Sequence, residues 1–193
     1  MKLTPRILTL STLLVLSGVA DAHPLHAGAA MADGFLHPWL GWDHLLAMVA
    51  VGLWARQRQS DMAVAWLPAS FVAAVAVGAW AGHWRGDAAM VESWIALSLV
   101  GLGALLALRV RLSMPLALLL VPAMGLAHGW AHGVELPASA PGLPFAAGFV
   151  GATAVLHGIG VAIAAGVLSR GAAPLLRIGG IGILASGCGL LLG

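Results

Sequence analysis

The chain has 193 residues, of which 61% are hydrophobic and only 8% are charged. A soluble domain usually carries about 25% charged residues, so most of this surface is expected to face lipid rather than water. The formal net charge of +2 and the absence of a basic run give no reason to expect a nucleic-acid partner. The single cysteine, Cys188, excludes an intramolecular disulfide and a cysteine-based metal cluster.

The first 22 residues are typical of a cleavable signal peptide. A positively charged start is followed by an apolar run over residues 7–19 and by Ala20-Asp21-Ala22, which fits the small-x-small rule for cleavage. An uncleaved anchor helix is the alternative. Residues 23–193 are expected to form one transmembrane permease domain.

Six apolar runs follow, and each is near the roughly 20 residues that a helix needs to cross a bilayer. They are 38–55, 62–81, 91–108, 114–131, 144–168 and 173–192. Pro38 is expected in the first turn of the first helix, a favoured position for proline. Pro68 and Pro122 lie inside the second and fourth runs, where membrane helices tolerate proline. The predicted fold class is an all-α membrane protein, a six-helix transmembrane bundle after removal of the signal peptide.

Arginine sets the predicted orientation, because positive residues mark the cytoplasmic side of a membrane. The second connection holds Arg85 beside Asp87, and the fourth has neither Lys nor Arg. The first, third and fifth connections hold Arg56 and Arg58, Arg109 and Arg111, and Arg170 and Arg177. These three connections are expected inside. Both termini of the mature chain then lie outside the bacterial cytoplasmic (inner) membrane.

Glycines at intervals of four predict close contacts between helices. Gly125, Gly129 and Gly133 form a stripe on the fourth run, and Gly78 and Gly82 form a pair on the second. Small residues at this spacing let helix backbones approach one another. They favour a compact bundle over a wide aqueous pore.

Ionisable residues gather at the outer ends of the predicted helices. An ionisable group in hydrocarbon costs about 2.5–3.5 kcal/mol on insertion scales and usually serves a pathway. The outer groups are His37, Asp43, His44, His83, Glu92, His128, His132 and Glu135, whereas His157 lies deeper. An end residue such as His83 can also reach the interface by snorkelling. Whether His23, His26, His83 and His157 take part in function stays open.

The fourth run offers half of a metal site. His128 and His132 are four residues apart and therefore share one face of the helix. Met124 continues this face inward, and Glu135 follows three residues after His132. Imidazole and carboxylate on one face, beside a glycine stripe that admits a neighbour, predict ligands for a divalent metal ion.

The first run offers the other half, with His37 just before it and Asp43 and His44 near its start. Adjacent residues point about 100° apart on a helix, so one of this pair could contact the metal while the other orients a ligand. The helix macrodipole also stabilises Asp43 at this position. Which of the three contacts the ion stays open, and His157 fits a hydrogen-bonded core residue as well as a ligand.

Three stretches resemble the signature of the HupE/UreJ family of nickel permeases. They are His37-Pro-x-x-Gly41-x-Asp43-His44, AHGWAHGVE over 127–135 and ATAVLHGIG over 152–160. With the leader, the six runs and the short connections, the resemblance covers nearly the whole chain. It implies uptake of Ni²⁺, with Co²⁺ as the alternative, for hydrogenase or urease maturation. It also implies roles for His37, Asp43, His44, Glu92, His128 and Glu135. The HX₄DH pattern of the larger nickel–cobalt transporter family is absent.

We therefore expect a transporter rather than an enzyme, with no permanently bound cofactor and no P-loop motif for direct use of ATP. The expected partners are the metal ion and the lipid bilayer, and a homo-oligomer and nickel-handling accessory proteins stay open. The choice among Ni²⁺, Co²⁺ and Zn²⁺ also stays open, and so does the choice between uniport and proton coupling.

Two alternatives are kept. One is an intramembrane metal-dependent hydrolase with Zn²⁺, although H-x-x-x-H at 128–132 lacks the Glu of the zinc-protease motif. The other is a haem-binding membrane subunit with His128 or His132 and His157 as axial ligands.

Overall fold

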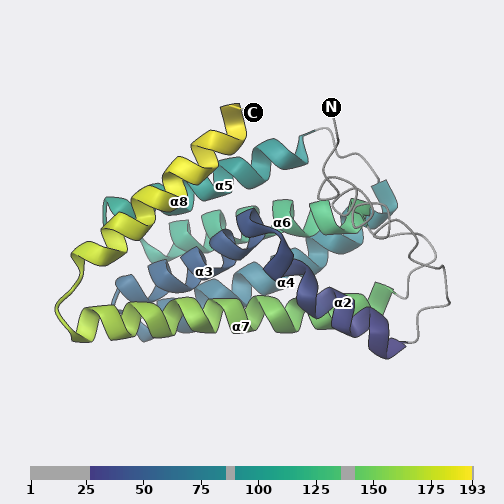
Figure 1. The fold of residues 1–193 in the computed structure, drawn as a ribbon, viewed down its shortest axis with the longest axis horizontal. Coiled ribbons are helices and arrows are strands. Elements are labelled where there is room, and N and C mark those ends of the chain that lie inside the picture. The colour runs from purple at the N-terminus through teal and green to yellow at the C-terminus, as the bar shows by residue number, and fades with distance from the viewer. Residues whose placement is uncertain (1–26, 86–89, 136–141, 193) are drawn as a thin grey trace, which may run out of the picture.

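The computed structural model describes residues 27–85, 90–135 and 142–192, and its regular secondary structure in these ranges is helical. The helices are α2 (Ala27–Leu40), α3 (Trp42–Gln57), α4 (Asp61–Arg85), α5 (Val91–Ala107), α6 (Met114–Glu135), α7 (Gly142–Ser169) and α8 (Pro174–Leu192). They form an elongated bundle in which α5 and α8 lie together along one side and α7 along the other (Figure 1). The predicted signal peptide, residues 1–22, lies outside the described residues.

The helices differ in their capacity to cross a membrane. Within the described ranges, α4, α6, α7 and α8 are long and apolar enough to do so. The helix α5 has 17 residues and α3 has 16, which makes them about 24–26 Å long at 1.5 Å per residue. The hydrocarbon core is about 30 Å thick. Each of the six predicted runs coincides with one or two of these helices. Because α3 and α5 are shorter than the hydrocarbon core is thick, the count of six spans stays a prediction.

The region around Gly41 differs from the prediction. The helix α2 contains Pro38 and continues to Leu40, and α3 begins only at Trp42. Gly41 between them has an extended backbone, with φ −89° and ψ 103°. The expectation that Pro38 opens the helix is wrong, because the preceding residues, which include several strong helix formers such as alanine, already form α2.

Glycines join α4 to α6, the most extensive helix contact in the described structure. A Cβ atom at Gly129 would collide with the carbonyl oxygen of Val75, and one at Gly78 with that of Leu126. Equivalent contacts occur at Gly82, Gly125 and Gly133. The two predicted glycine stripes therefore face each other, which confirms the expected close approach.

Three connections meet at one end of the bundle, here called the arginine end. The indole of Trp54 donates to the carbonyl oxygen of Val110 at 3.1 Å, and the guanidinium of Arg58 donates to that of Leu112 at 2.8 Å. Arg177 on α8 donates to the carbonyl oxygen of Ala107 at 3.1 Å. The α3–α4, α5–α6 and α7–α8 connections thus share one side, as their arginines predicted.

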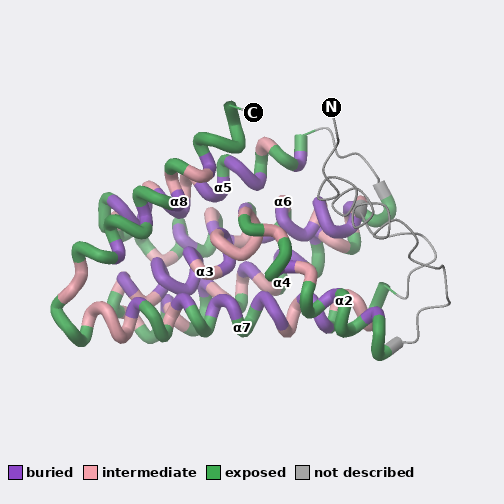
Figure 2. Tube along the Cα trace, viewed as in Figure 1, coloured by how far each residue is buried: buried purple, intermediate pink, exposed green. Residues whose placement is uncertain are grey.

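The outside of the bundle is rich in large apolar side chains. Exposed positions run along the outer faces of the helices, and α8 is exposed over much of its length (Figure 2). Trp66, Trp80 and Trp84 of α4 are 58%, 69% and 73% exposed. Soluble monomers rarely present so much apolar surface, so this surface is expected to lie in lipid.

Candidate metal centre

Four histidines from three helices pack together and form what is here called the four-histidine cluster. His37 lies in the last turn of α2, His44 in the first turn of α3, and His128 and His132 on α6. The ring centroid of His132 lies 4.7 Å from that of His37 and 4.5 Å from that of His44. The rings of His44 and His128 are 5.0 Å apart. The structure thus joins the histidines of the two predicted half-sites.

The break at Gly41 places the first two members of this cluster. The break separates the last turn of α2 from the first turn of α3, and the rings of His37 and His44 on its two sides both contact His132 of α6. A Cβ atom at Gly41 would lie only 3.1 Å from Oδ1 of Asp43 and 3.2 Å from Nδ1 of His44. A larger residue would therefore crowd these two side chains, which gives a physical reason for the glycine in this motif.

Asp43 orients His44. The Nδ1 atom of His44 lies 3.0 Å from Oδ1 of Asp43, and an ionised carboxylate can only accept, so Nδ1 carries the proton. In the neutral imidazole the lone pair is then on Nε2. That atom is buried and has no hydrogen-bond partner among the described residues. It has the protonation state that a metal ligand needs.

Ser98 of α5 orients His128 in the same way. The hydroxyl of Ser98 donates to the carbonyl oxygen of Ile95 at 2.7 Å, and its Oγ lies 2.9 Å from Nε2 of His128. Because the only hydroxyl proton is engaged, Oγ accepts from Nε2, and Nδ1 of His128 keeps the lone pair. Nδ1 is buried and lacks a hydrogen-bond partner in the described part of the chain.

Aromatic rings enclose the cluster on two sides. The ring centroid of Phe149 on α7 lies 4.2 Å from that of His132, and Phe71 of α4 lies 5.7 Å from His128. Phe145, one turn before Phe149, lies 5.8 Å from His37. Apolar walls of this kind exclude water and strengthen the interaction of an ion with the imidazoles.

Of the predicted acidic residues, Asp43 contacts a ring of the cluster, whereas Glu92 and Glu135 are not placed against one in the described part of the chain. Glu92 is exposed in the first turn of α5. Glu135 is the last residue of α6, and its side chain lies outside the described residues. His83 is exposed and packs on Trp84. Among the described side chains no three His, Cys, Asp or Glu are placed to hold a metal ion together, so an ion would need the packed rings to separate.

Comparison with known proteins identifies the family of the chain. The family described as "HupE / UreJ protein" matches residues 11–190. The chain belongs to the HupE/UreJ family. Protein HupE of Rhizobium leguminosarum bv. viciae is 38% identical to it over 189 residues, which are 97% of this chain and 98% of that protein. No solved structure matches. The resemblance read from the sequence motifs is thereby confirmed for nearly the whole chain.

The sequence reasoning missed four side chains that contact the cluster in this HupE/UreJ protein, Ser98 and the aromatic residues Phe71, Phe145 and Phe149. Ser98 is a polar residue in an otherwise apolar stretch, IALSLVGLG, and a serine inside a predicted span was a usable signal. Phe71 carries no such signal, because an aromatic residue in an apolar helix is ordinary. Only the packing of α4 against α6 shows that it contacts His128.

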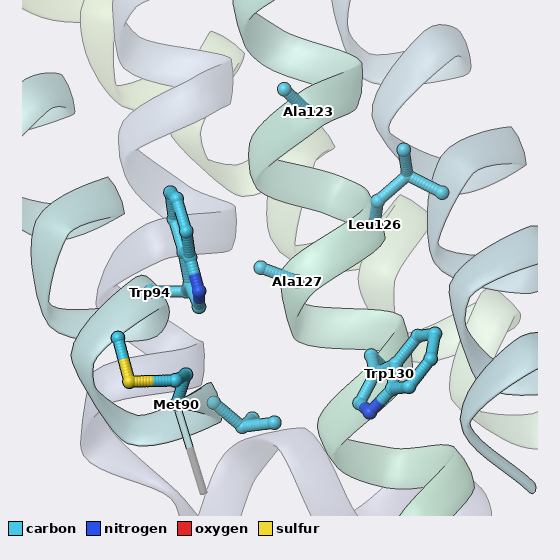
Figure 3. Close-up of a pocket in the computed structure, with 7 residues that line it drawn as sticks. Met90, Trp94, Ala123, Leu126, Ala127 and Trp130 are labelled. Carbon is cyan, nitrogen blue, oxygen red and sulfur yellow. The ribbon is translucent and has the colours of Figure 1, made fainter. Parts of the chain in front are cut away.

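A separate groove of about 360 Å³ lies between the start of α5 and the outer face of α6 in this HupE/UreJ protein. Trp94 and Trp130 point toward it from opposite sides, with Met90 at its end (Figure 3). A second groove of about 200 Å³ shares Trp94 with the first and reaches Ser98. The lining is almost wholly apolar, which fits contact with lipid rather than metal binding.

Proposed function

We propose that this chain is a transporter that carries a divalent transition-metal ion, Ni²⁺ before Co²⁺, into the cell for hydrogenase or urease maturation. The nickel assignment rests on the HupE/UreJ resemblance. The four-histidine cluster would capture the ion, with Glu92 and Glu135 contributing at the entrance, and the ion would then pass between α3, α5 and α6.

One observation carries this proposal. His44 and His128 each have one ring nitrogen fixed by a neighbour, Asp43 or Ser98, and the other buried without a hydrogen-bond partner among the described residues. Metal-binding histidines commonly have this arrangement, in which the second nitrogen donates to a carboxylate or another acceptor. Leaving a buried nitrogen unpartnered costs stability, and a passing metal ion would use it.

The donor set suits a transported ion of the first transition series. Imidazole binds nickel, cobalt, zinc and copper, whereas thiolate ligands favour tighter and softer sites. The only cysteine, Cys188, is exposed on α8. Binding by imidazole and carboxylate is compatible with both capture and release.

In the proposed orientation, the membrane potential would drive the metal ion inward. The arginine end would face the cytoplasm and the four-histidine cluster the exterior of a bacterial inner membrane, with six spans crossing and both termini outside. A divalent ion that moves inward through about 100 mV gains roughly 4.6 kcal/mol. At about 1.4 kcal/mol for each factor of ten, this supports accumulation of about a thousandfold. Facilitated permeation would therefore suffice.

The two alternatives fit the structure less well. For haem, the ring of Phe71 contacts both His128 and His157, at 5.7 and 5.1 Å, so a side chain fills the space that a haem would need. For a zinc hydrolase, Gly129 stands where the zinc-protease motif has its catalytic Glu.

Uptake of radioactive nickel by cells that express the chain tests the proposal. We expect His44→Ala and His132→Ala to abolish uptake, while His83→Ala, an exposed histidine outside the cluster, retains it. Uptake should also fall when the membrane potential is collapsed. The proposal is wrong if the two cluster variants accumulate nickel like wild type at equal expression.

A further inference from the structure

His157 lies midway along α7 and outside the four-histidine cluster. It is 2% exposed. Its Nδ1 atom donates to the carbonyl oxygen of Met48 at 2.6 Å, and a carbonyl can only accept, so the lone pair of the neutral ring is on Nε2. This Nε2 is buried and has no hydrogen-bond partner among the described residues. His157 therefore repeats the arrangement of His44 and His128 at a different depth.

One face of α7 leads from the cluster to this histidine. Phe149, Thr153 and His157 are spaced by four and are all buried, so they share a face. Phe149 contacts His132 at the cluster. His157 lies two turns further toward the arginine end, where α7 finishes at Ser169.

Phe71 separates His157 from the cluster. Its ring is fully buried, with its centroid 5.7 Å from that of His128 and 5.1 Å from that of His157. A single side chain thus contacts both imidazoles. An aromatic face also attracts a cation within about 6 Å of its centre.

The position of His157 is fixed by close contact between α3 and α7. A Cβ atom at Gly52 of α3 would collide with the carbonyl oxygen of His157, and one at Gly160 of α7 with that of Val49. The same α3 carries His44 and, four residues later, Met48, which holds Nδ1 of His157. His44 and the carbonyl that holds Nδ1 of His157 therefore lie about one turn apart on the same helix.

A residue of α4 that lines the same groove as His157 has a carbonyl oxygen without its regular helical donor. His157 lines a groove of about 420 Å³ between α4 and α7, together with Val64 and Pro68. Proline has no N–H, so Pro68 cannot donate the helical hydrogen bond to the carbonyl oxygen of Val64. The other lining residues are apolar or glycine, so the imidazole of His157 is the only side chain of this groove lining that could bind a metal ion.

We infer that Nε2 of His157 is a second metal-binding position, deeper than the four-histidine cluster, which receives the ion from His128 once the ring of Phe71 turns aside. The inference rests on the proposed function and adds a step to it. Two positions at successive depths let an ion be released in stages, because each is built from few ligands and neither binds too tightly.

Binding of radioactive Ni²⁺ to the purified full-length protein in detergent tests this position. The wild type is expected to hold two ions. His157→Asn is the informative variant, because its amide nitrogen can replace Nδ1 in the bond to Met48 while the ligand Nε2 is lost. It should hold one ion and lower uptake in cells at least tenfold. A variant with both His44→Ala and His128→Ala should hold the other ion alone, and His83→Asn should hold two.

A purely structural role for His157 predicts the opposite result. If His157→Asn binds two ions and transports like wild type, the second position is overturned. The proposed function survives that result, because nickel is still taken up. If the wild type itself neither binds nor accumulates nickel, the proposed function fails and the second position with it. If His157→Asn does not fold, His157→Gln replaces it as the test. Its amide oxygen is a poorer nickel ligand than imidazole, so this variant must hold the deeper ion at least tenfold more weakly than the wild type does.

Discussion

The Nε2 atom of His128 donates to Oγ of Ser98 across 2.9 Å, and this bond joins α6 to α5. It selects the tautomer that leaves Nδ1 free for a metal ion. The bond also links the four-histidine cluster to the α5–α8 pair, which packs only lightly against α6. A hydroxyl that contacts no ion thus decides which nitrogen of the imidazole can bind one.

Replacement of Ser98 by alanine should weaken metal capture without removing a ligand. With no acceptor for Nε2, the proton of His128 can move to Nδ1, and loss of such an orienting partner typically costs 10–100-fold in metal affinity. Nickel uptake at limiting concentration measures the effect, with Ser93→Ala on the same helix as the control. Equal affinity for Ser98→Ala and wild type would show that this bond does not orient a ligand.

Asp43 should behave as an orienting residue as well. In Asp43→Asn the amide oxygen can still accept from Nδ1 of His44, but the charge that makes the imidazole a stronger ligand is lost. We expect roughly tenfold weaker nickel uptake for Asp43→Asn and a larger loss for Asp43→Ala. Asp61→Asn, at an exposed position in α4, is the matched control. A loss in Asp43→Asn as complete as in His44→Ala would instead indicate that Asp43 binds the ion directly.

The positions of the histidines along their helices were predictable from sequence, but their contacts with one another were not. Intervals of four placed His128 and His132 on one face, and the arginines placed the connections. The break at Gly41 was missed, because Pro38 reads as a helix start and an extended glycine leaves no mark in an apolar run. The tautomers of His128 and His157 depend on Ser98 and on the Met48 carbonyl. These partners are distant in sequence from the rings that they hold, so only tertiary packing shows them.

Two glycine substitutions should differ in their effects on stability. Gly129→Ala places a Cβ against the Val75 carbonyl, and overpacking of this kind costs about 1–3 kcal/mol. Gly158 lies on α7 with no atom within 4 Å of a built Cβ, so Gly158→Ala should be neutral or stabilise by up to about 1 kcal/mol. Thermal unfolding in detergent would compare them, with a lower midpoint for Gly129→Ala. Equal midpoints for the two variants would mean that the α4–α6 contact is looser than the structure indicates.

The orientation of the bundle gives the final prediction. The arginine end holds the α3–α4, α5–α6 and α7–α8 connections together, and positive residues favour the cytoplasm. Alkaline phosphatase, which is active only outside the inner membrane, should therefore be active when fused after Leu192 and inactive when fused after Arg170. Green fluorescent protein at the same two sites should give the reverse pattern and serves as the control. Phosphatase activity after Arg170 alone would invert the topology and place the four-histidine cluster on the cytoplasmic side, where it would release metal rather than capture it.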